Sequence, residues 1–240
     1  MIYCNDLAEL DGGLGFFERR ENTMKHDFQY ISKNNQAVKE DYKNLVNLLY
    51  EVQQVLSKTF TFQFTIVGSY KRNMITYDTR SNVGYDFDFN IEINDDKFDA
   101  KQTKTKFFEG IRKVAKKYGY DNPEDSTSVI TIKKKDTKNC RVLSSCDFCI
   151  VNNYIDEDGD ECQEYIHFDK KTNRYFWNER SAGYYMLPDK IGWLKENDLW
   201  AEVRDRYIKL KNKNEDPNVH SRTMFANAVH QMCQKYGYFE

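Results

Sequence analysis

Two aspartates separated by a single apolar residue are the side chains of this chain best suited to chemistry. Asp86 and Asp88 belong to the run Gly84-Tyr-Asp-Phe-Asp-Phe-Asn-Ile-Glu-Ile93, whose alternating pattern predicts a strand. Because successive strand side chains point to opposite faces, both carboxylates share one face and the aromatic residues occupy the other. Neighbouring carboxylates repel each other unless a cation lies between them, and oxygen ligands at this spacing suit Mg²⁺.

A glycine-serine pair precedes this strand, and a third aspartate follows it. The run Phe60-Thr-Phe-Gln-Phe-Thr-Ile-Val67 predicts a strand that ends at Gly68 and Ser69. Glycine permits a tight turn, while Ser69 can cap a following helix and, with free helix N–H groups, face a phosphate chain. Lys71 and Arg72 add positive charge nearby. A plain helix cap is the other interpretation of Ser69.

The third aspartate, Asp147, lies in the apolar run from Arg141 to Val151, which predicts another strand. Charged residues are rarely buried in such a strand without a partner. Asp147 is therefore interpreted either as an inward aspartate paired with Lys or Arg, or as a third metal ligand. Because Asp86 and Asp88 are also present, the interpretation of Asp147 as a metal ligand is favoured.

The order of strand, Gly-Ser, short helix, Asp-apolar-Asp strand and later strand aspartate resembles the nucleotidyltransferase superfold typified by DNA polymerase β. The long connection from Asn73 to Gly84 is similar to that of the branch containing cyclic GMP-AMP synthase and oligoadenylate synthases. The resemblance implies an α+β fold with a mixed sheet and two Mg²⁺ or Mn²⁺ ions, held by the catalytic residues Asp86, Asp88 and Asp147. It implies that a nucleoside triphosphate is bound by Gly68, Ser69, Lys71 and Lys209.

Lys209 enters this set through a short run in the C-terminal part, Arg206-Tyr-Ile-Lys209. The run resembles the Arg-x-x-Lys helix that, in the same branch, sends a lysine to the triphosphate. A charged, solvent-exposed helix face explains the run as well.

The activity implied by the resemblance is transfer of a nucleoside monophosphate to a hydroxyl acceptor, with release of pyrophosphate. The acceptor stays open among a second nucleotide, an RNA 3′ end, a small antibiotic-like alcohol and a protein side chain. A second nucleotide, giving a cyclic or linear oligonucleotide, is favoured. Two alternatives are an inactive nucleotide-binding or partner-binding module of the same fold, such as the antitoxin-like half of a two-protein system, and a carboxylate-dependent nuclease.

Composition bounds these interpretations. The 240 residues are 40% hydrophobic and 15% aromatic, which provides for a real core, and 36 basic against 38 acidic side chains leave a net charge of -2. That balance makes a long nucleic acid an unlikely partner. No apolar segment is long enough to span a membrane, and no signal-peptide pattern opens the chain, so we expect a cytoplasmic protein with free thiols. Cys146 and Cys149 have zinc-like spacing but no second pair.

The rest of the chain positions the three aspartates. Residues 1–58 are expected to hold a lead-in, in which the Gly12 to Gly15 run is too isolated for a phosphate loop, and one long amphipathic helix from about Phe28 to Ser57. Residues 59–186 form the predicted nucleotidyltransferase core, and residues 187–240 form a small helical region that begins at Pro188. Within the core, 128–135 and 140–151 are expected to pair antiparallel, with Lys133, Lys134 and Lys135 protecting an edge strand.

Overall fold

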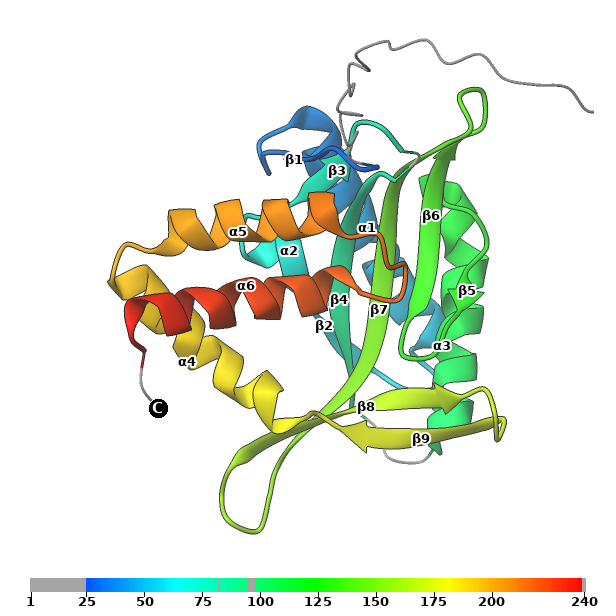
Figure 1. The fold of residues 1–240 in the computed structure, drawn as a ribbon. Coiled ribbons are helices and arrows are strands. Elements are labelled where there is room, and N and C mark those ends of the chain that lie inside the picture. Colours follow the sequence, from blue (N-terminus) through cyan, green and yellow to red (C-terminus); the bar gives the residue numbers. More distant parts are fainter. Residues whose placement is uncertain (1–24, 82, 95–97, 239–240) are drawn as a thin grey trace, which may run out of the picture.

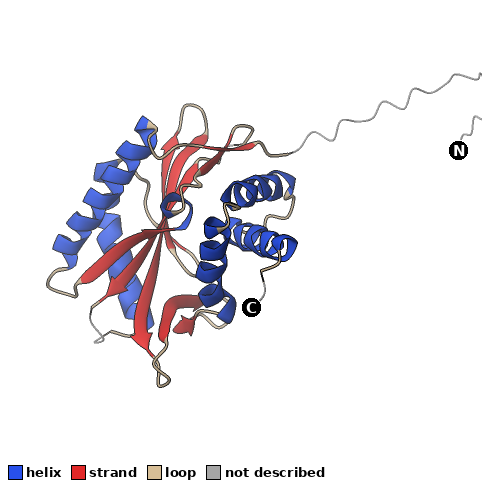
Figure 2. Ribbon diagram, turned by 90° about the vertical axis from the view of Figure 1, so that its left-hand side faces the viewer, coloured by secondary structure: helices blue, strands red, loops and turns tan. Residues whose placement is uncertain are grey.

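The structure, a computed structural model, describes residues 25–81, 83–94 and 98–238, and it has three layers. A mixed sheet lies in the middle, with helices packed on both of its faces (Figure 2). The helices α1 (Gln36–Leu56) and α3 (Ala100–Val114) lie on one face, and α4 (Ala182–Glu196), α5 (Trp200–Lys213) and α6 (Ser221–Tyr236) lie on the other. The α+β class predicted from the sequence is confirmed.

The sheet is built around one parallel pair of strands, β4 (Tyr85–Ile93) and β7 (Arg141–Ile155). Its order is β2 (Phe62–Val67), β4, β7, β6 (Ile130–Asp136) and β5 (Glu124–Asp125), and every other pairing along it is antiparallel. The far half of β7 continues into β8 (Glu161–Asp169) and β9 (Arg174–Glu179) (Figure 1). The predicted antiparallel pair of β6 and β7 is confirmed.

Alternation along β4 divides the sheet into a core face and a polar face. Tyr85, Phe87, Phe89 and Ile91 are buried against α1 and α3, while Asp86 is exposed and Asp88 half-buried on the other side. The same alternation buries Cys146, Phe148 and Ile150 of β7. A one-residue slip of either strand would invert this division, so burial of the aromatic residues fixes the register.

The N-terminal helix is shorter than predicted. It begins at Gln36, because the side chain of Asn35 accepts a hydrogen bond from the Ala37 N–H and caps it. The preceding residues, predicted as helix, instead form β1 (Phe28–Tyr30), which pairs antiparallel with β3 (Thr76–Asp78). The prediction was wrong there because a three-residue strand leaves almost no periodic signal.

The three C-terminal helices enclose a second apolar core that includes Val203, Tyr207, Phe225 and Val229. The helical region does not start at Pro188 as predicted. Pro188 lies inside α4, which begins at Ala182, so the predicted boundary between residues 186 and 187 falls within one helix. Proline removes one backbone hydrogen bond in the interior of a helix, but tertiary packing can override this local preference.

Four further predictions concern the lysines of β6, the cysteine thiols, membrane-spanning segments and the N-terminal glycine run. The strand β6 is flanked by β5, and each lysine that was expected to protect an edge has an acidic partner: Lys133 with Glu124, Lys134 with Asp41 and Lys135 with Asp121. The five cysteines within the described ranges are free. Among the described helices, none combines the length and apolar character needed to cross a bilayer. The Gly12 to Gly15 run lies outside the described residues.

A buried aspartate anchors the small β1–β3 sheet and supplies a test of pH-dependent stability. Asp78 is fully buried, and it lies 2.7 Å from His26 Nδ1 and accepts hydrogen bonds from the backbone N–H groups of Asp27 (2.9 Å) and Arg80 (3.0 Å). Burial alone would raise the pKa of Asp78, but its hydrogen bonds outweigh burial and hold that pKa well below the usual range.

We expect Asp78→Asn to lower the free energy of unfolding by about 1–3 kcal/mol at pH 7. The stabilisation by a carboxylate of depressed pKa is present above the unfolded pKa of about 4, and it is lost as pH falls below that value. Urea unfolding at pH 7 and at pH 3 measures this change. An equal loss at both pH values would show that the charge of Asp78 is not what stabilises this sheet.

Candidate functional site

The parallel pair β4–β7 brings the three predicted aspartates to one face of the sheet. Asp88 is paired in register with Asp147, and Asp86 is paired with Ser145. Side chains of directly paired residues on adjoining strands point to the same face, so Asp86, Asp88 and Asp147 form one acidic cluster. This face is the one covered by α4, α5 and α6, whereas the apolar face packs on α1 and α3 (Figure 2).

The Gly68–Ser69 turn lies directly beside Asp88. The chain leaves β2 at Val67, which pairs with Asp88, and enters the short helix α2 (Gly68–Lys71). The Ser69 backbone N–H acts on the nearby Asp88 carboxylate and lowers its pKa. The Ser69 hydroxyl makes a long contact of 3.5 Å to the Asp86 carbonyl oxygen.

Gly68 is required here by backbone conformation and by space. Its φ is +64°, and a Cβ atom would overlap Asp88 Oδ2 and lie 2.7 Å from Asp88 Cγ. Gly119 offers a matched comparison, since its φ is +81° and a Cβ atom there would meet nothing within 4 Å.

We expect Gly119→Ala to lower the free energy of unfolding by about 1–2 kcal/mol, the cost of a left-handed conformation. Gly68→Ala should lower it by about 1–3 kcal/mol more, because the Asp88 carboxylate has to move. Urea unfolding of both variants gives the difference. Equal losses in the two variants would mean that the turn does not press on Asp88.

Two hydroxyl groups hold the other carboxylates. Thr131 of β6, directly opposite Asp147, donates from Oγ1 to Asp147 Oδ1 at 2.6 Å. The Ser145 hydroxyl donates to Asp86 Oδ1. The Thr131 and Ser145 donors were not predicted from the sequence, because only strand pairing brings them to the carboxylates.

The environment of the cluster disfavours its negative charge. Burial raises the pKa of Asp88 to about 6, and repulsion by Asp86 adds to this effect. Burial likewise raises the pKa of Asp147 to about 7, against the hydrogen bond from Thr131. Removal of water by the surrounding protein also raises the pKa of Asp86, although part of its side chain is open to solvent. Such clustering of perturbed carboxylates is typical of functional sites.

Three cations from the helices face this cluster. Arg72, just after α2, and Arg222, in the first turn of α6, lower the pKa of Asp88 electrostatically, and Lys211 of α5 does the same for Asp86. Lys211 is buried and donates to Thr76 Oγ1 at 2.8 Å. Within the described residues, Arg72 Nε has no hydrogen-bond partner, and its guanidinium lies 4.1 Å from the centre of the Phe225 ring.

The two lysines predicted to bind nucleotide, Lys71 and Lys209, are exposed. Arg72 and Lys211, close to them in the sequence, are cations that act electrostatically on Asp88 and Asp86. Residues two apart on a helix point about 200° away from each other, so Lys209 faces away from the side that carries Lys211. The signal that identifies Lys211 is its spacing of four residues from the buried Tyr207, which in turn lies four residues after Val203.

A cavity of about 240 Å³ lies beside Lys211, between the start of the β1 segment and the start of α6. Its lining includes His26, Phe28, His220 and Ser221. Of the three aspartates and the three cations that act on them, only Lys211 lines this cavity.

The donor set has the chemistry of a divalent-cation site, because it consists of three carboxylates on neighbouring positions of one face. In the conformation described, however, no three acidic, histidine or cysteine side chains converge on a point where they could hold an ion, among the residues described. Asp147 accepts a hydrogen bond from Thr131, and Asp86 accepts one from Ser145. The residue types fit a divalent metal.

Comparison with known proteins supports the fold. No protein-family model matches the sequence, and no curated protein matches it either. The fold is similar to the STING-associated CdnE c-di-GMP synthase from Capnocytophaga granulosa, with a TM-score of 0.51 and 14% identity over 84% of this chain and 62% of that one. It is also similar to Escherichia coli DncV bound to 3′-deoxy GTP, with a TM-score of 0.50 and 12% identity over 80% of this chain and 53% of that one.

The chain thus spans between about half and two thirds of the length of these solved structures. At this level of identity the likeness establishes the fold. The polymerase β-like nucleotidyltransferase fold predicted from the Gly-Ser turn and the three aspartates is confirmed.

Proposed function

We propose that this chain, whose fold is that of nucleotidyltransferases, transfers a nucleoside monophosphate from a nucleoside triphosphate to a hydroxyl acceptor. The observation that carries the proposal is the acidic cluster itself, in which Asp88 is in register with Asp147 and Arg72, Lys211 and Arg222 face the same side. Carboxylates and cations gathered on one face of the sheet suit a substrate that carries many negative charges together with divalent metal.

In the proposed reaction the oxygen of the acceptor hydroxyl attacks the α-phosphorus and forms a new oxygen–phosphorus bond. The bond from the α-phosphorus to the bridging oxygen breaks, pyrophosphate leaves, and the hydroxyl proton passes to a carboxylate or to solvent. Asp147, a carboxylate of the same cluster, is the proposed proton acceptor. Lys211, Arg72 and Arg222 would neutralise charge on the phosphates.

Asp86, Asp88 and Asp147 are the residues proposed to hold two Mg²⁺ or Mn²⁺ ions. Divalent cations bound there would lower the pKa of the acceptor hydroxyl and neutralise charge on the triphosphate. Gly68 and Ser69 would let the backbone come close to the phosphates.

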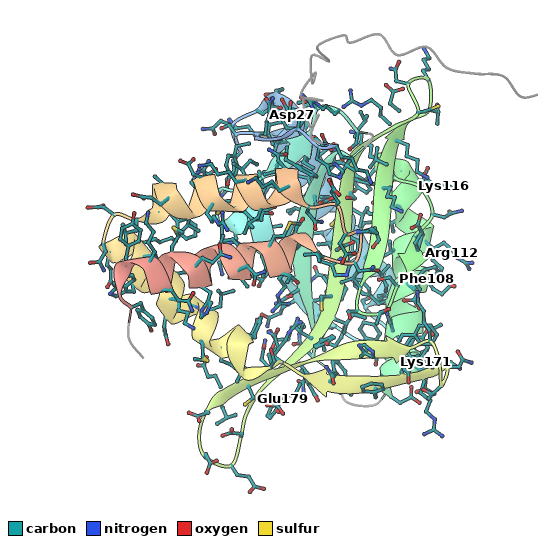
Figure 3. All side chains as sticks on the ribbon, viewed as in Figure 1. Asp27, Phe108, Arg112, Lys116, Lys171 and Glu179 are labelled. Atoms are coloured by element: carbon teal, nitrogen blue, oxygen red, sulfur yellow. The ribbon has the colours of Figure 1, made fainter. Side chains whose placement is uncertain are left out.

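A second nucleotide is the acceptor that we favour, so the product would be a cyclic or linear oligonucleotide. One support is the fold, which is similar to a c-di-GMP synthase. Another is the distribution of basic residues, since Lys133, Lys134 and Lys135 are each engaged by an acidic partner. Arg112 of α3 and Lys116 of the short 3-10 helix that follows it, η1 (Ala115–Tyr118), project on the far side of the sheet (Figure 3), away from the acidic cluster. This distribution disfavours a long nucleic acid as acceptor.

One observation favours an inactive module of the same fold as the second candidate function. The three carboxylates do not converge on one point in the conformation described. Against this candidate stands the free energy cost of keeping three partly buried carboxylates together, which serves no purpose in an inert protein.

The test is incubation with every pair of nucleoside triphosphates, one of them labelled at the α-phosphate, in the presence of Mg²⁺ or Mn²⁺. Phosphatase is added afterwards, because it releases the label from unreacted triphosphate but not from an internucleotide bond. We expect a phosphatase-resistant labelled product with at least one pair. Complete release of the label with every pair would contradict a nucleotide acceptor, and nucleotide binding without product would favour the inactive module.

A further inference from the structure

A buried carboxylate that takes no part in the proposed chemistry lies behind the acidic cluster. Asp41 of α1 is 3% exposed, and its carboxylate accepts three hydrogen bonds. The donors are the Tyr85 hydroxyl at 2.8 Å, the Ser144 hydroxyl at 2.7 Å and Lys134 Nζ at 2.7 Å. Each donor belongs to a different strand, β4, β7 and β6 respectively.

These three donors lie at one level of the sheet. Tyr85 is paired in register with Ser144, and Ser144 is paired with Lys134. The carboxylate of Asp41 therefore joins the two strands that carry the aspartates to a third strand and to α1. It does so from the apolar face, opposite the acidic cluster.

The next residue along β4 and along β7 belongs to the acidic cluster. Asp86 follows Tyr85, Ser145 follows Ser144, and the Ser145 hydroxyl donates to Asp86. Asp88 and Asp147 lie two positions further along the same pair of strands. Any change in the spacing or register of β4 and β7 at the level of Asp41 is thus transmitted directly to the carboxylates.

This end of the strand pair needs such a connection. Parallel pairing is slightly weaker per residue than antiparallel pairing, and the ladder of β6 is irregular between Lys134 and Lys135. The carboxylates of the paired Asp88 and Asp147 repel each other across the two strands. A buried ion pair contributes little to stability compared with apolar residues of the same size, but it can specify one arrangement of the chain.

We propose that Asp41 is a positioning residue, which holds β4 and β7 in the arrangement that lets Asp86, Asp88 and Asp147 bind divalent metal. The inference rests on the proposed function of that cluster. Asp41 contacts neither metal nor nucleotide in this account, and it acts through Tyr85 and Ser144. Partners that orient metal-binding carboxylates typically change metal affinity by about 10- to 100-fold when they are removed.

The test compares Asp41→Asn with a matched control, Asp125→Asn. Asp125 of β5 also receives a tyrosine hydroxyl and a lysine, Tyr175 at 2.8 Å and Lys104 at 2.7 Å, but it is separated from β4 by β6 and β7. Mn²⁺ titration measures metal affinity, and hydrogen exchange followed by mass spectrometry measures protection of residues 85–93 and 141–151. We expect Asp41→Asn to weaken Mn²⁺ binding about tenfold and to speed exchange in both segments, and Asp125→Asn to do neither.

Tyr85→Phe, with Tyr175→Phe as its control, answers the question if Asp41→Asn does not fold, because it removes one hydroxyl and leaves no charge unpaired. The expected changes have the same direction and are smaller. Unchanged Mn²⁺ affinity in folded Asp41→Asn and Tyr85→Phe would overturn the inference. If the unmodified chain binds no Mn²⁺, the proposed function fails instead. In that case hydrogen exchange still tests the role of Asp41, and unchanged exchange of residues 85–93 and 141–151 in Asp41→Asn would overturn it.

Discussion

Asp88→Asn is expected to reduce nucleotidyl transfer at least about a thousandfold. Asparagine keeps the shape of the side chain but removes the charge, and positioning with charge neutralisation provides most of the rate enhancement in this class of reaction. The measurement is formation of phosphatase-resistant product under single-turnover conditions, with the nucleotide in excess of its dissociation constant. A loss smaller than tenfold would mean that Asp88 is not a metal ligand.

Urea unfolding of Asp88→Asn shows whether a loss of activity comes from the missing carboxylate or from a failure to fold. Burial raises the pKa of Asp88 to about 6, so its ionised form is less favourable in the folded chain than in the unfolded chain. The metal-free variant should therefore unfold at a higher urea concentration than the unmodified protein at pH 7.5. Asp136→Asn is the control, and it should unfold at a lower urea concentration than the unmodified protein. Hydrogen bonds from Asn139 lower the pKa of Asp136, so its charge stabilises the folded chain.

Lys211→Met is expected to weaken nucleoside triphosphate binding by about 10- to 100-fold. Loss of a hydrogen bond to a charged group costs about 1.5–3 kcal/mol, and each 1.4 kcal/mol is tenfold in affinity. Methionine keeps most of the length and volume of lysine, so the packing of this side chain against the Phe28 and Tyr207 rings is largely retained. Titration with a non-hydrolysable triphosphate in Mg²⁺ measures the effect.

Lys209→Met is the matched control for Lys211→Met, since Lys209 lies on the same helix and is exposed. Triphosphate affinity should be unchanged in this variant. The reverse result, with weak binding in Lys209→Met and normal binding in Lys211→Met, would restore the nucleotide-binding role predicted for Lys209 from the sequence.

The elements that depend on local periodicity could be predicted from the sequence. Alternation along residues 85–93 identified β4 and its buried face, and the apolar run around Asp147 identified β7. These patterns are visible because one face of each strand is buried against helices. The strands β1 and β3 were missed because each has only three residues, and their pairing depends on the position of Asp78 rather than on a pattern.

The site could be predicted only where its residues are adjacent in sequence or lie on recognisable strands. The three aspartates met this condition. Arg222 did not, because it is brought to Asp88 by the packing of α6 over the sheet, which the sequence around Arg222 does not predict. Lys211 could have been predicted to lie on the buried face of its helix, because Val203, Tyr207 and Lys211 recur every four residues. Asp41 carried a similar signal, since it lies three residues after Val38 and four before Leu45 in the buried stripe of α1.

The central claim is that the three aspartates hold a nucleoside triphosphate through divalent metal. Calorimetric titration with a non-hydrolysable triphosphate tests it most directly, with and without Mg²⁺, in the unmodified chain and in the Asp86→Ala, Asp88→Ala double variant. The account predicts binding by the unmodified chain that requires Mg²⁺ and is absent from the double variant. Binding of equal strength without Mg²⁺ or in the double variant, or no binding to the unmodified chain under any condition, would contradict it.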